Sequence, residues 1–300
     1  MVVDGRRIVY FGMAGEFSRI PFEKLLAAGA NVAAVVFPRP GRAEGGPRWL
    51  PAAAKPIGSG NLLLSPAQPN ILALAARHQI PVLEVGALKS AAALDAFKAL
   101  KADLGVVACF PRLLPEAWLE ATPLGCLNLH PSLLPAYRGP YPMFWQLRAG
   151  DTRTGVTLHR MDAGTDTGDI VAQREASWPE GARDLELDRL AASLGADMLI
   201  EALALEQLPR KPQPNHGASY QGAPTEADRV ISLGWAVRRA FNFVRGARAW
   251  APFWVDVGDG RHVQVDEALA FELGSEQPHG YIEGDGEKRF QFSDGVLAGK

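Results

Sequence analysis

The sequence has little cysteine and no long apolar run. Its only cysteines, Cys109 and Cys126, are too few for a disulfide scaffold, and they do not have a CxxC or zinc-ligand spacing. We therefore expect both thiols to be buried and reduced. No apolar stretch reaches about 18 residues, and no signal-peptide pattern follows Met1. These absences predict a cytoplasmic protein without a membrane partner.

The charges are balanced, which argues against a strongly basic nucleic-acid binder. Lysine and arginine number 31 against 33 aspartates and glutamates, so the net charge is −2. DNA is therefore not an expected partner, although a local basic face can still exist. With 47% hydrophobic and 21% charged residues, the chain has the composition of a globular protein. Its 300 residues suffice for one large domain or two smaller ones.

The first two thirds of the chain alternate strand-like and helix-like segments. Short runs of β-branched and aromatic residues predict buried parallel strands. The expected strands are 7–12, 31–37, 80–83, 103–108, 124–130, 154–161 and 170–173, and the expected helices are 16–28, 71–78, 87–100, 115–120 and 184–205. Residues 38–69, rich in proline, glycine and arginine, are expected to form a long loop. This order predicts an α/β fold, a doubly wound and mostly parallel Rossmann-like sheet.

The composition changes after the predicted closing helix. Residues 208–224 are dense in proline, glycine, glutamine and asparagine, which is typical of a linker. One basic helix, 233–248, and several short β-rich pieces with glycine and aspartate turns follow. We therefore expect a first domain over residues 1–207, a linker over 208–224 and a small OB-like β-barrel over 225–300.

The segment LNLHPSLLPAYRG, residues 127–139, carries the strongest chemical signal. Asn128 and His130 are two residues apart on a predicted strand, so both side chains project to one face. They lie at the carboxyl end of that strand, where open α/β sheets place their sites. A lone histidine there is more often structural. An Asn-x-His pair before a rigid Pro-Ser-Leu-Leu-Pro turn indicates a functional site instead.

A second segment, MDAGTDTGDIVAQ, gathers the carboxylates of Asp162, Asp166 and Asp169 around two glycines. A polar turn with aspartate as turn former is the plain alternative. With His130 and His159 these carboxylates could also bind a metal. Because no HExxH or EF-hand spacing is present, we expect no metal.

Together, LNLHPSLLPAYRG and TGVTLHRMDAGTDTGDIVAQ resemble the folate-dependent formyltransferases. This family includes methionyl-tRNA formyltransferase, UDP-amino-sugar formyltransferases and glycinamide ribonucleotide formyltransferase. The resemblance covers about residues 7–205 and extends less clearly to the C-terminal barrel. It implies an enzyme that uses 10-formyltetrahydrofolate as co-substrate. It also implies that the family's catalytic residues fall on Asn128, His130 and Asp166.

The chemistry of formyl transfer suits these residue types. Transfer to an amine passes through a tetrahedral intermediate that bears an oxyanion. Asn128 and a protonated His130 can each donate a hydrogen bond to that oxygen. Asp166 can keep the imidazole protonated and accept the proton that the amine loses. No covalent intermediate is required, and Ser132 lacks the GxSxG setting of a nucleophile.

The expected folate contacts follow from the resemblance. The stretch FPRLL, residues 110–114, matches the one that forms the pterin pocket, and the SLLP turn and the 161–165 loop would wall that pocket. Ordinary core packing is the alternative for the leucines. The residues expected to bind folate are Phe110, Arg112, Leu113, Leu114, Ser132, Leu133, Leu134, Pro135 and Asp162.

The motifs leave the acceptor amine open. A basic loop holds Arg42 and Arg48 where the tRNA-modifying members carry a loop that enters the acceptor stem. Against tRNA, residues 225–300 hold nine basic and twelve acidic residues, and PYPMFWQ follows Gly139 where tRNA members resemble Gly-Ala-Ala-Pro. TGVTLHRM also resembles the sugar-modifying members. The residues expected to bind the acceptor are Arg42, Arg48, Arg138 and Tyr141.

Aminoacylated initiator tRNA is therefore the favoured acceptor by a thin margin over a small amine or a nucleotide amino sugar. Two other classes of protein stay open. A 10-formyltetrahydrofolate hydrolase would use the same three residues with water in place of the amine. A non-catalytic folate- or RNA-binding module would leave the three polar residues unexplained.

Overall fold

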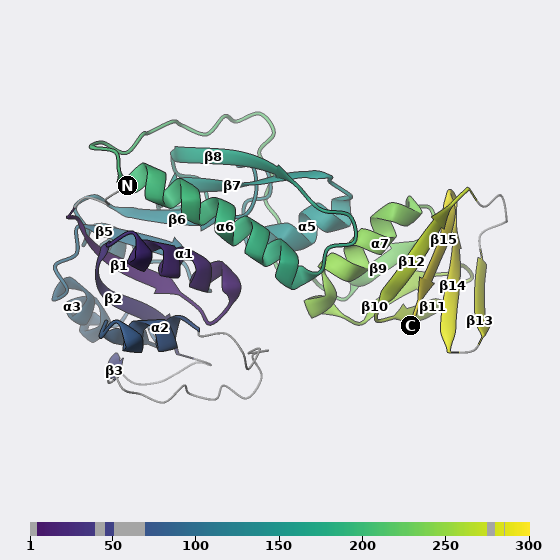
Figure 1. The fold of residues 1–300 in the computed structure, drawn as a ribbon, viewed down its shortest axis with the longest axis horizontal. Coiled ribbons are helices and arrows are strands. Elements are labelled where there is room, and N and C mark those ends of the chain that lie inside the picture. Colours follow the sequence, from purple (N-terminus) through teal and green to yellow (C-terminus); the bar gives the residue numbers. More distant parts are fainter. Residues whose placement is uncertain (1–4, 40–45, 51–69, 275–279, 285) are drawn as a thin grey trace. The chain divides into compact units, whose positions relative to one another are not determined.

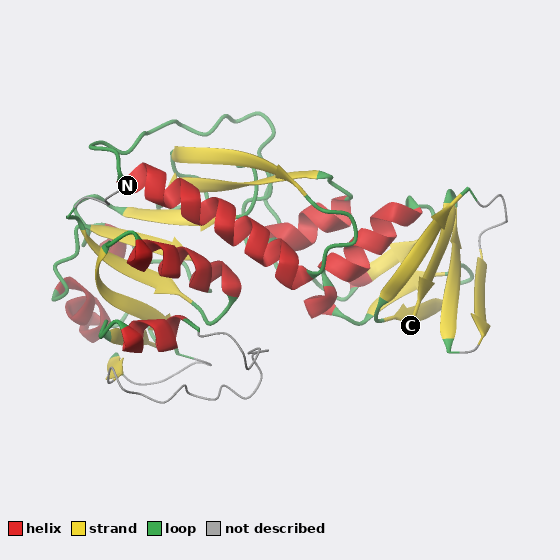
Figure 2. Ribbon diagram, viewed as in Figure 1, coloured by secondary structure: helices red, strands yellow, loops and turns green. Residues whose placement is uncertain are grey.

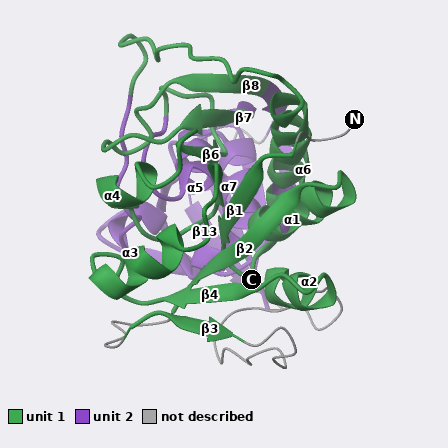
Figure 3. Ribbon diagram, turned by 90° about the vertical axis from the view of Figure 1, so that its left-hand side faces the viewer, with its two compact units in different colours: residues 1–136, 155–174, 188–218 green, residues 137–154, 175–187, 219–300 purple. Residues whose placement is uncertain are grey.

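The computed structural model describes residues 5–39, 46–50, 70–274, 280–284 and 286–300. The chain divides into two units, each assembled from three stretches of sequence (Figure 3). Unit 1 comprises residues 1–136, 155–174 and 188–218, and unit 2 comprises residues 137–154, 175–187 and 219–300. The sequence analysis expected two domains that follow one another along the chain, with boundaries at 207 and 224. The two units are interleaved in sequence, and the expected boundaries stay a prediction.

An eight-stranded sheet organises the first two thirds of the chain (Figure 1). Its strands in spatial order are β3 (Arg48–Leu50), β4 (Val82–Val85), β2 (Asn31–Pro38), β1 (Arg7–Gly12), β5 (Leu104–Ala108), β6 (Cys126–His130), β7 (Arg153–Arg160) and β8 (Ile170–Ser177). The pairs from β4 to β6 are parallel, whereas β3 runs antiparallel to β4 and β7 antiparallel to β6. The predicted doubly wound, mostly parallel sheet is confirmed.

Helices cover both faces of this sheet, as its apolar strands require (Figure 3). One face carries α1 (Glu16–Ala27), α2 (Ile71–Arg77) and α6 (Asp184–Leu203), and the other carries α3 (Ala91–Lys98) and α4 (Glu116–Leu119). Ion pairs join α1 to α6: Lys24 Nζ lies 2.6 Å from Asp197 Oδ1, and Arg189 Nε lies 3.2 Å from Glu16 Oε2.

Local signals explain where several elements begin. Asn70 and Ser90 accept hydrogen bonds from backbone N–H groups in the first turns of α2 and α3, so α3 starts at Ala91 rather than at residue 87. The sequence analysis placed no strand at β3 and no helix at α5 (Pro142–Ala149). Pro142 lies at the first helical position and Gly150 directly after the last one. Both are ordinary signals of a helix start and end, and the sequence analysis did not use them.

The C-terminal strands form two small sheets (Figure 2). Their strands in spatial order are β11 (His262–Val265), β10 (Phe253–Asp256) and β9 (Val230–Ser232) in one sheet, and β12 (Ala268–Leu273), β15 (Gly295–Gly299), β14 (Glu287–Phe292) and β13 (Gly280–Gly284) in the other. Between α7 (Val237–Gly246) and these strands lies one apolar core, which includes Phe243, Phe253 and Phe290. This arrangement agrees with the expected small C-terminal β-domain.

Two expectations drawn from composition concern membranes and thiols. None of the helices in the described stretches is long and apolar enough to cross a bilayer. Cys126 is buried on β6. Cys109 is exposed as a whole residue, so the expectation of two buried cysteines was wrong for it, although burial raises the pKa of its thiol to about 11. Cys109 directly follows β5, where the chain leaves the sheet with a positive φ of 59°.

The absence of a side chain at Gly105 makes room for Cys126. The two residues are partners in the β5–β6 register, and a Cβ at position 105 would lie 2.4 Å from the Cys126 sulfur. Overpacking of this kind costs about 1–3 kcal/mol. We therefore expect Gly105→Ala to lower the free energy of unfolding, measured in urea, by about that amount, and by clearly less in a Cys126→Ala background.

The matched control is Gly5→Ala, because a Cβ at Gly5 would have no neighbouring atom within 4 Å. Its effect should stay within about 0.5 kcal/mol. An equal cost of Gly105→Ala with and without the Cys126 sulfur would contradict this account of the packing.

Candidate functional site

Strand β6 presents Asn128 and His130 at its carboxyl end, as the sequence predicts. His130 is only 4% exposed, and Asn128 is half-buried. Both lie within a strand whose other residues, Cys126, Leu127 and Leu129, are apolar and buried. Two polar side chains in such surroundings must find partners or they cost free energy.

Strand β7 supplies the first partner. Its antiparallel register with β6 places His159 opposite Asn128. The imidazole is 2% exposed; its Nδ1 lies 2.8 Å from the Arg160 carbonyl oxygen, and its Nε2 lies 3.1 Å from Asn128 Nδ2. Because a carbonyl only accepts, Nδ1 carries a proton and donates it. In the neutral ring, Nε2 then accepts from Asn128, which fixes the amide orientation.

Asp166 completes the cluster from the loop between β7 and β8. Its Oδ1 lies 3.3 Å from Asn128 Nδ2 and 3.4 Å from His159 Nε2. Its Oδ2 lies 3.6 Å from His130 Nδ1, and its side chain is only 14% exposed. The structure thus brings the three predicted catalytic residues, an amide, an imidazole and a carboxylate, to one place in unit 1.

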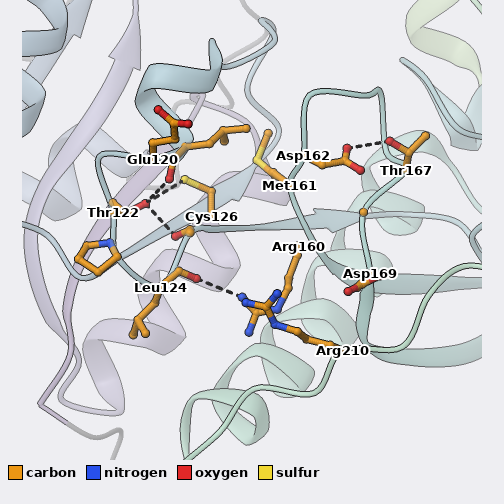
Figure 4. Close-up of a pocket in the computed structure, with 14 residues that line it drawn as sticks. Glu120, Thr122, Leu124, Cys126, Arg160, Met161, Asp162, Thr167, Asp169 and Arg210 are labelled. Atoms are coloured by element: carbon orange, nitrogen blue, oxygen red, sulfur yellow. Dashed lines mark hydrogen bonds between the residues drawn. The ribbon is translucent and has the colours of Figure 1, made fainter.

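The loop around Asp166 is held from both sides. Asp162 Oδ1 accepts hydrogen bonds from Gly164 N at 3.0 Å and from Thr167 Oγ1 at 2.7 Å (Figure 4). From residues expected to be a linker, Gln213 Nε2 donates to the carbonyl oxygens of Asp166 and Gly168, each at 2.8 Å. These contacts support Asp166 in the left-handed region, at φ 54°, which a non-glycine residue rarely adopts.

Gly168 is required for the close approach of this loop to β7. A Cβ there would lie 2.0 Å from the Arg160 carbonyl oxygen, the same oxygen that accepts from His159. The TDTG pattern around Asp166 therefore has a steric reason as well as a chemical one.

The turn after β6 is tied to the sheet through Ser132 and Leu134. The Ser132 hydroxyl donates to the Ala136 carbonyl oxygen at 2.8 Å, and its own carbonyl accepts from Thr157 Oγ1 at 2.7 Å. Leu134 is 3% exposed and its carbonyl accepts from Gln173 Nε2. Ser132 and Leu134 thus have structural roles, whereas Leu133 and Pro135 are half-buried and accessible to a ligand.

The predicted pterin stretch follows β5 directly. Phe110 and Leu114 pack against the apolar core that includes Phe11 and Trp118. Arg112 donates from Nη2 to the Arg39 carbonyl oxygen at 3.0 Å. Leu113 is 66% exposed, which makes it the member of the stretch most open to a ligand. Folate binding by this stretch stays a prediction.

The predicted acceptor residues are spread over both units. Arg42 lies outside the described residues. Arg48 Nη2 lies 3.0 Å from Glu84 Oε2, a buried carboxylate that also pairs with Arg39. Arg138 and Tyr141 belong to unit 2, where Arg138 N donates to Ser219 O. The Tyr141 ring is half exposed and packs edge-on against Trp250, with ring centroids 4.7 Å apart.

The sequence analysis missed two residues that contact the predicted catalytic residues. His159 was weighed only as a metal ligand, and Gln213 was not weighed at all. A polar residue at the end of an apolar strand, the signal used for His130, could have singled out His159. Within the described stretches, no group of three or more histidine, cysteine, aspartate or glutamate side chains is arranged to hold a metal ion.

The sequence matches the family model described as formyl transferase over residues 59–203. It is 40% identical over 222 residues to the methionyl-tRNA formyltransferase of Syntrophus aciditrophicus, covering 73% of this chain and 70% of that protein. It is 34% identical over 264 residues to the methionyl-tRNA formyltransferase of Nitrobacter hamburgensis, covering 86% of this chain and 79% of that protein.

Among solved structures, the chain is similar to the N-formyltransferase from Helicobacter canadensis in complex with folinic acid and dTDP-3-aminofucose. The TM-score is 0.66 at 16% identity, and the likeness covers 100% of both chains. At that identity the likeness establishes a shared fold.

We expect the neutral His159 ring to carry its proton on Nδ1, because the Arg160 carbonyl can only accept and the amide nitrogen of Asn128 can only donate. Long-range ¹H–¹⁵N correlation of the imidazole rings measures this directly. The exposed His216 serves as an internal control for an unconstrained ring. A proton found on Nε2 of His159 would overturn the orientation assigned to Asn128.

Proposed function

Because the chain belongs to the formyl transferase family, we propose that it transfers a formyl group from 10-formyltetrahydrofolate to a primary amine. The observation that carries this proposal is the convergence of Asn128, His130 and Asp166 in one cluster, with Asp166 oxygens 3.3 Å from the Asn128 amide nitrogen and 3.6 Å from His130 Nδ1. A donor amide, an imidazole and a carboxylate suit acyl transfer through a charged tetrahedral intermediate.

In this mechanism, the amine nitrogen forms a bond to the formyl carbon while the formyl oxygen becomes an oxyanion. Asn128 keeps one amide N–H on His159, and the other, which faces Asp166 in the structure, is redirected to donate to that oxygen. Protonated His130 donates to the same oxygen. Asp166 attracts the positive charge of His130 and accepts the amine proton, directly or through one water. The bond from carbon to the folate nitrogen then breaks, and that nitrogen takes a proton.

The proposed transfer needs no protein nucleophile. The Ser132 hydroxyl, the nearest candidate in sequence, donates its hydrogen bond to the Ala136 carbonyl, and Ser132 is fully buried. A hydroxyl so engaged has no neighbouring base to activate it. Direct attack by the acceptor amine agrees with this arrangement.

The folate would bind along the segment after β5 and against the 161–165 loop. Leu113, Leu133 and Pro135 remain accessible for apolar contact, and Arg112 is placed at the same end of the sheet by its bond to Arg39. We propose these contacts from the family resemblance and the exposure of the side chains. We also place the reaction in the cytoplasm, as the sequence analysis expects.

For the acceptor, we propose aminoacylated initiator tRNA. The relatives from Syntrophus aciditrophicus and Nitrobacter hamburgensis, both named methionyl-tRNA formyltransferase, support this choice, since the chain covers 70% and 79% of their lengths. The basic loop that holds Arg42 and Arg48 agrees with contacts to phosphates.

A nucleotide amino sugar or another small amine is the second candidate. The net charge of −3 over residues 225–300 disfavours tRNA docking there. The fold likeness to the N-formyltransferase from Helicobacter canadensis, solved with dTDP-3-aminofucose, extends over both whole chains. The bulky residues that follow Gly139, with Tyr141 half exposed, are a further reason to test small acceptors.

The deciding experiment incubates the purified protein with 10-formyltetrahydrofolate and a panel of acceptors, namely deacylated tRNA, methionyl-tRNA and a set of amino sugars. Formyl transfer to methionyl-tRNA alone is the expected result. Transfer to an amino sugar instead would show that the acceptor is the second candidate and not tRNA. Formate release that needs no amine would identify a hydrolase, and no turnover with any acceptor would refute the proposed enzyme.

We expect Asp166→Asn to lower kcat by about 10²- to 10⁴-fold, because the variant can neither accept the amine proton nor stabilise an imidazolium. His130→Ala should have a comparable effect. The charge-matched control is Asp95→Asn on the exposed surface of α3, which should leave kcat unchanged. The measurement is kcat at saturating concentrations of both substrates. If Asp166→Asn turns over as fast as the unmodified protein, Asp166 has no part in the mechanism.

A further inference from the structure

A cavity lies in unit 1, beside the segment that leads into β6 and the residues that follow β7 (Figure 4). Its volume is about 530 Å³, within the range of small-molecule sites. It is lined by the segment from α4 to the start of β6, by the end of β7, by residues 161–162 and 167–169, and by Arg210. Asn128, His130 and Asp166 are not among its lining residues, although Asp162, which is expected to bind folate, is one of them.

Arg160 enters this cavity without a carboxylate partner. Its Nη1 donates to the Leu124 carbonyl oxygen at 3.1 Å and its Nη2 to the Leu208 carbonyl oxygen at 3.4 Å. Its Nε–H is buried and has no hydrogen-bond partner among the described residues. Carbonyl oxygens accept from these donors, but they carry no full negative charge to pair with the guanidinium.

Arg210 brings a second guanidinium to the same place. Burial, and secondly the charge of Arg210, lower the pKa of Arg160, while Asp169 acts in the opposite direction. Within the part of the chain that the structure describes, neither guanidinium has a carboxylate oxygen within 4.0 Å. Two like charges therefore share one hollow, an arrangement that an anion between them would stabilise.

Of the three carboxylates in the lining, only Asp169 lies near the guanidiniums (Figure 4). It raises the pKa of Arg160 but has no oxygen within 4.0 Å of either guanidinium. Asp162 accepts from Gly164 N and Thr167 Oγ1 within its own loop. Figure 4 shows Asp162 and Glu120 at the opposite end of the view from the two guanidiniums. The two guanidiniums thus share one end of the cavity with Asp169, whereas Glu120 and Asp162 lie away from them.

We propose that this cavity binds a phosphate-bearing small molecule, with its phosphate between the guanidiniums of Arg160 and Arg210. Two positive charges match a phosphate dianion, and the planar guanidinium forks bind phosphate oxygens in pairs. The cavity volume exceeds that of phosphate alone, which points to a phosphomonoester whose remaining atoms occupy the rest of the space.

Such a ligand would be connected to the catalytic cluster through Arg160, and also through the loop that carries Asp166. The Arg160 carbonyl oxygen accepts from His159 Nδ1, while the Arg160 guanidinium lies in the cavity. Occupation of the cavity therefore acts on the same residue that orients His159.

The test is isothermal titration of the full chain with inorganic phosphate and with ribose 5-phosphate, at constant ionic strength and without folate or amine. The outcome is thus independent of the proposed function. We expect saturable binding of both probes, with ribose 5-phosphate the tighter. Arg210→Gln should raise both Kd values by at least about tenfold, since one of the two guanidiniums is lost. The Arg210 side chain is exposed, so this substitution should leave the fold intact.

The matched control is Arg77→Gln, which removes one positive charge from the exposed end of α2 in the same unit. It should leave both Kd values unchanged. No saturable binding, or equal Kd values in Arg210→Gln and the unmodified protein, would overturn the site. If ribose 5-phosphate binds no more tightly than inorganic phosphate, the assignment of the ligand as a phosphomonoester is wrong.

Discussion

The antiparallel pairing of β6 with β7 is the constraint on which the site depends. A parallel sheet alone would present Asn128 and His130 at a strand end without partners in the neighbouring strand. Because β7 reverses direction, it places His159 opposite Asn128 and lets the following loop return with Asp166. Buried polar groups are costly unless they bond to one another, and here each bond also fixes an orientation needed for chemistry.

The position of Asp166 has a conformational cost that distant residues offset. A non-glycine residue in the left-handed region costs about 1–3 kcal/mol. The Asp162 turn holds the loop from within, and Gln213 bonds to two of its carbonyl oxygens from a segment about 45 residues further along the chain. The segment expected to be a simple linker is therefore also part of the support of the carboxylate.

Much of the fold and the core of the site could be predicted because their signals are local. Apolar runs closed by glycine indicate buried strands, and the alternation of side chains along β6 places Asn128 and His130 on one face. The contacts of Asp166 and His159 depend on a strand register and on a left-handed residue, which no periodicity in the sequence specifies. Helix α5 was missed although its Pro142 start and Gly150 end are local signals, because attention went to the motif that precedes it.

Acceptor selection has to reside outside the catalytic cluster, because attack on a formyl carbon makes the same demands for any amine. The chain leaves unit 1 at Ala136, six residues after His130, and the next segment belongs to unit 2. In that segment Tyr141 holds a left-handed backbone at φ 60° directly before Pro142, with its ring against Trp250. Backbone strain at a half-exposed aromatic residue persists only where the surroundings enforce it. Variation of this segment is therefore the place to look for the difference between a tRNA and a small acceptor.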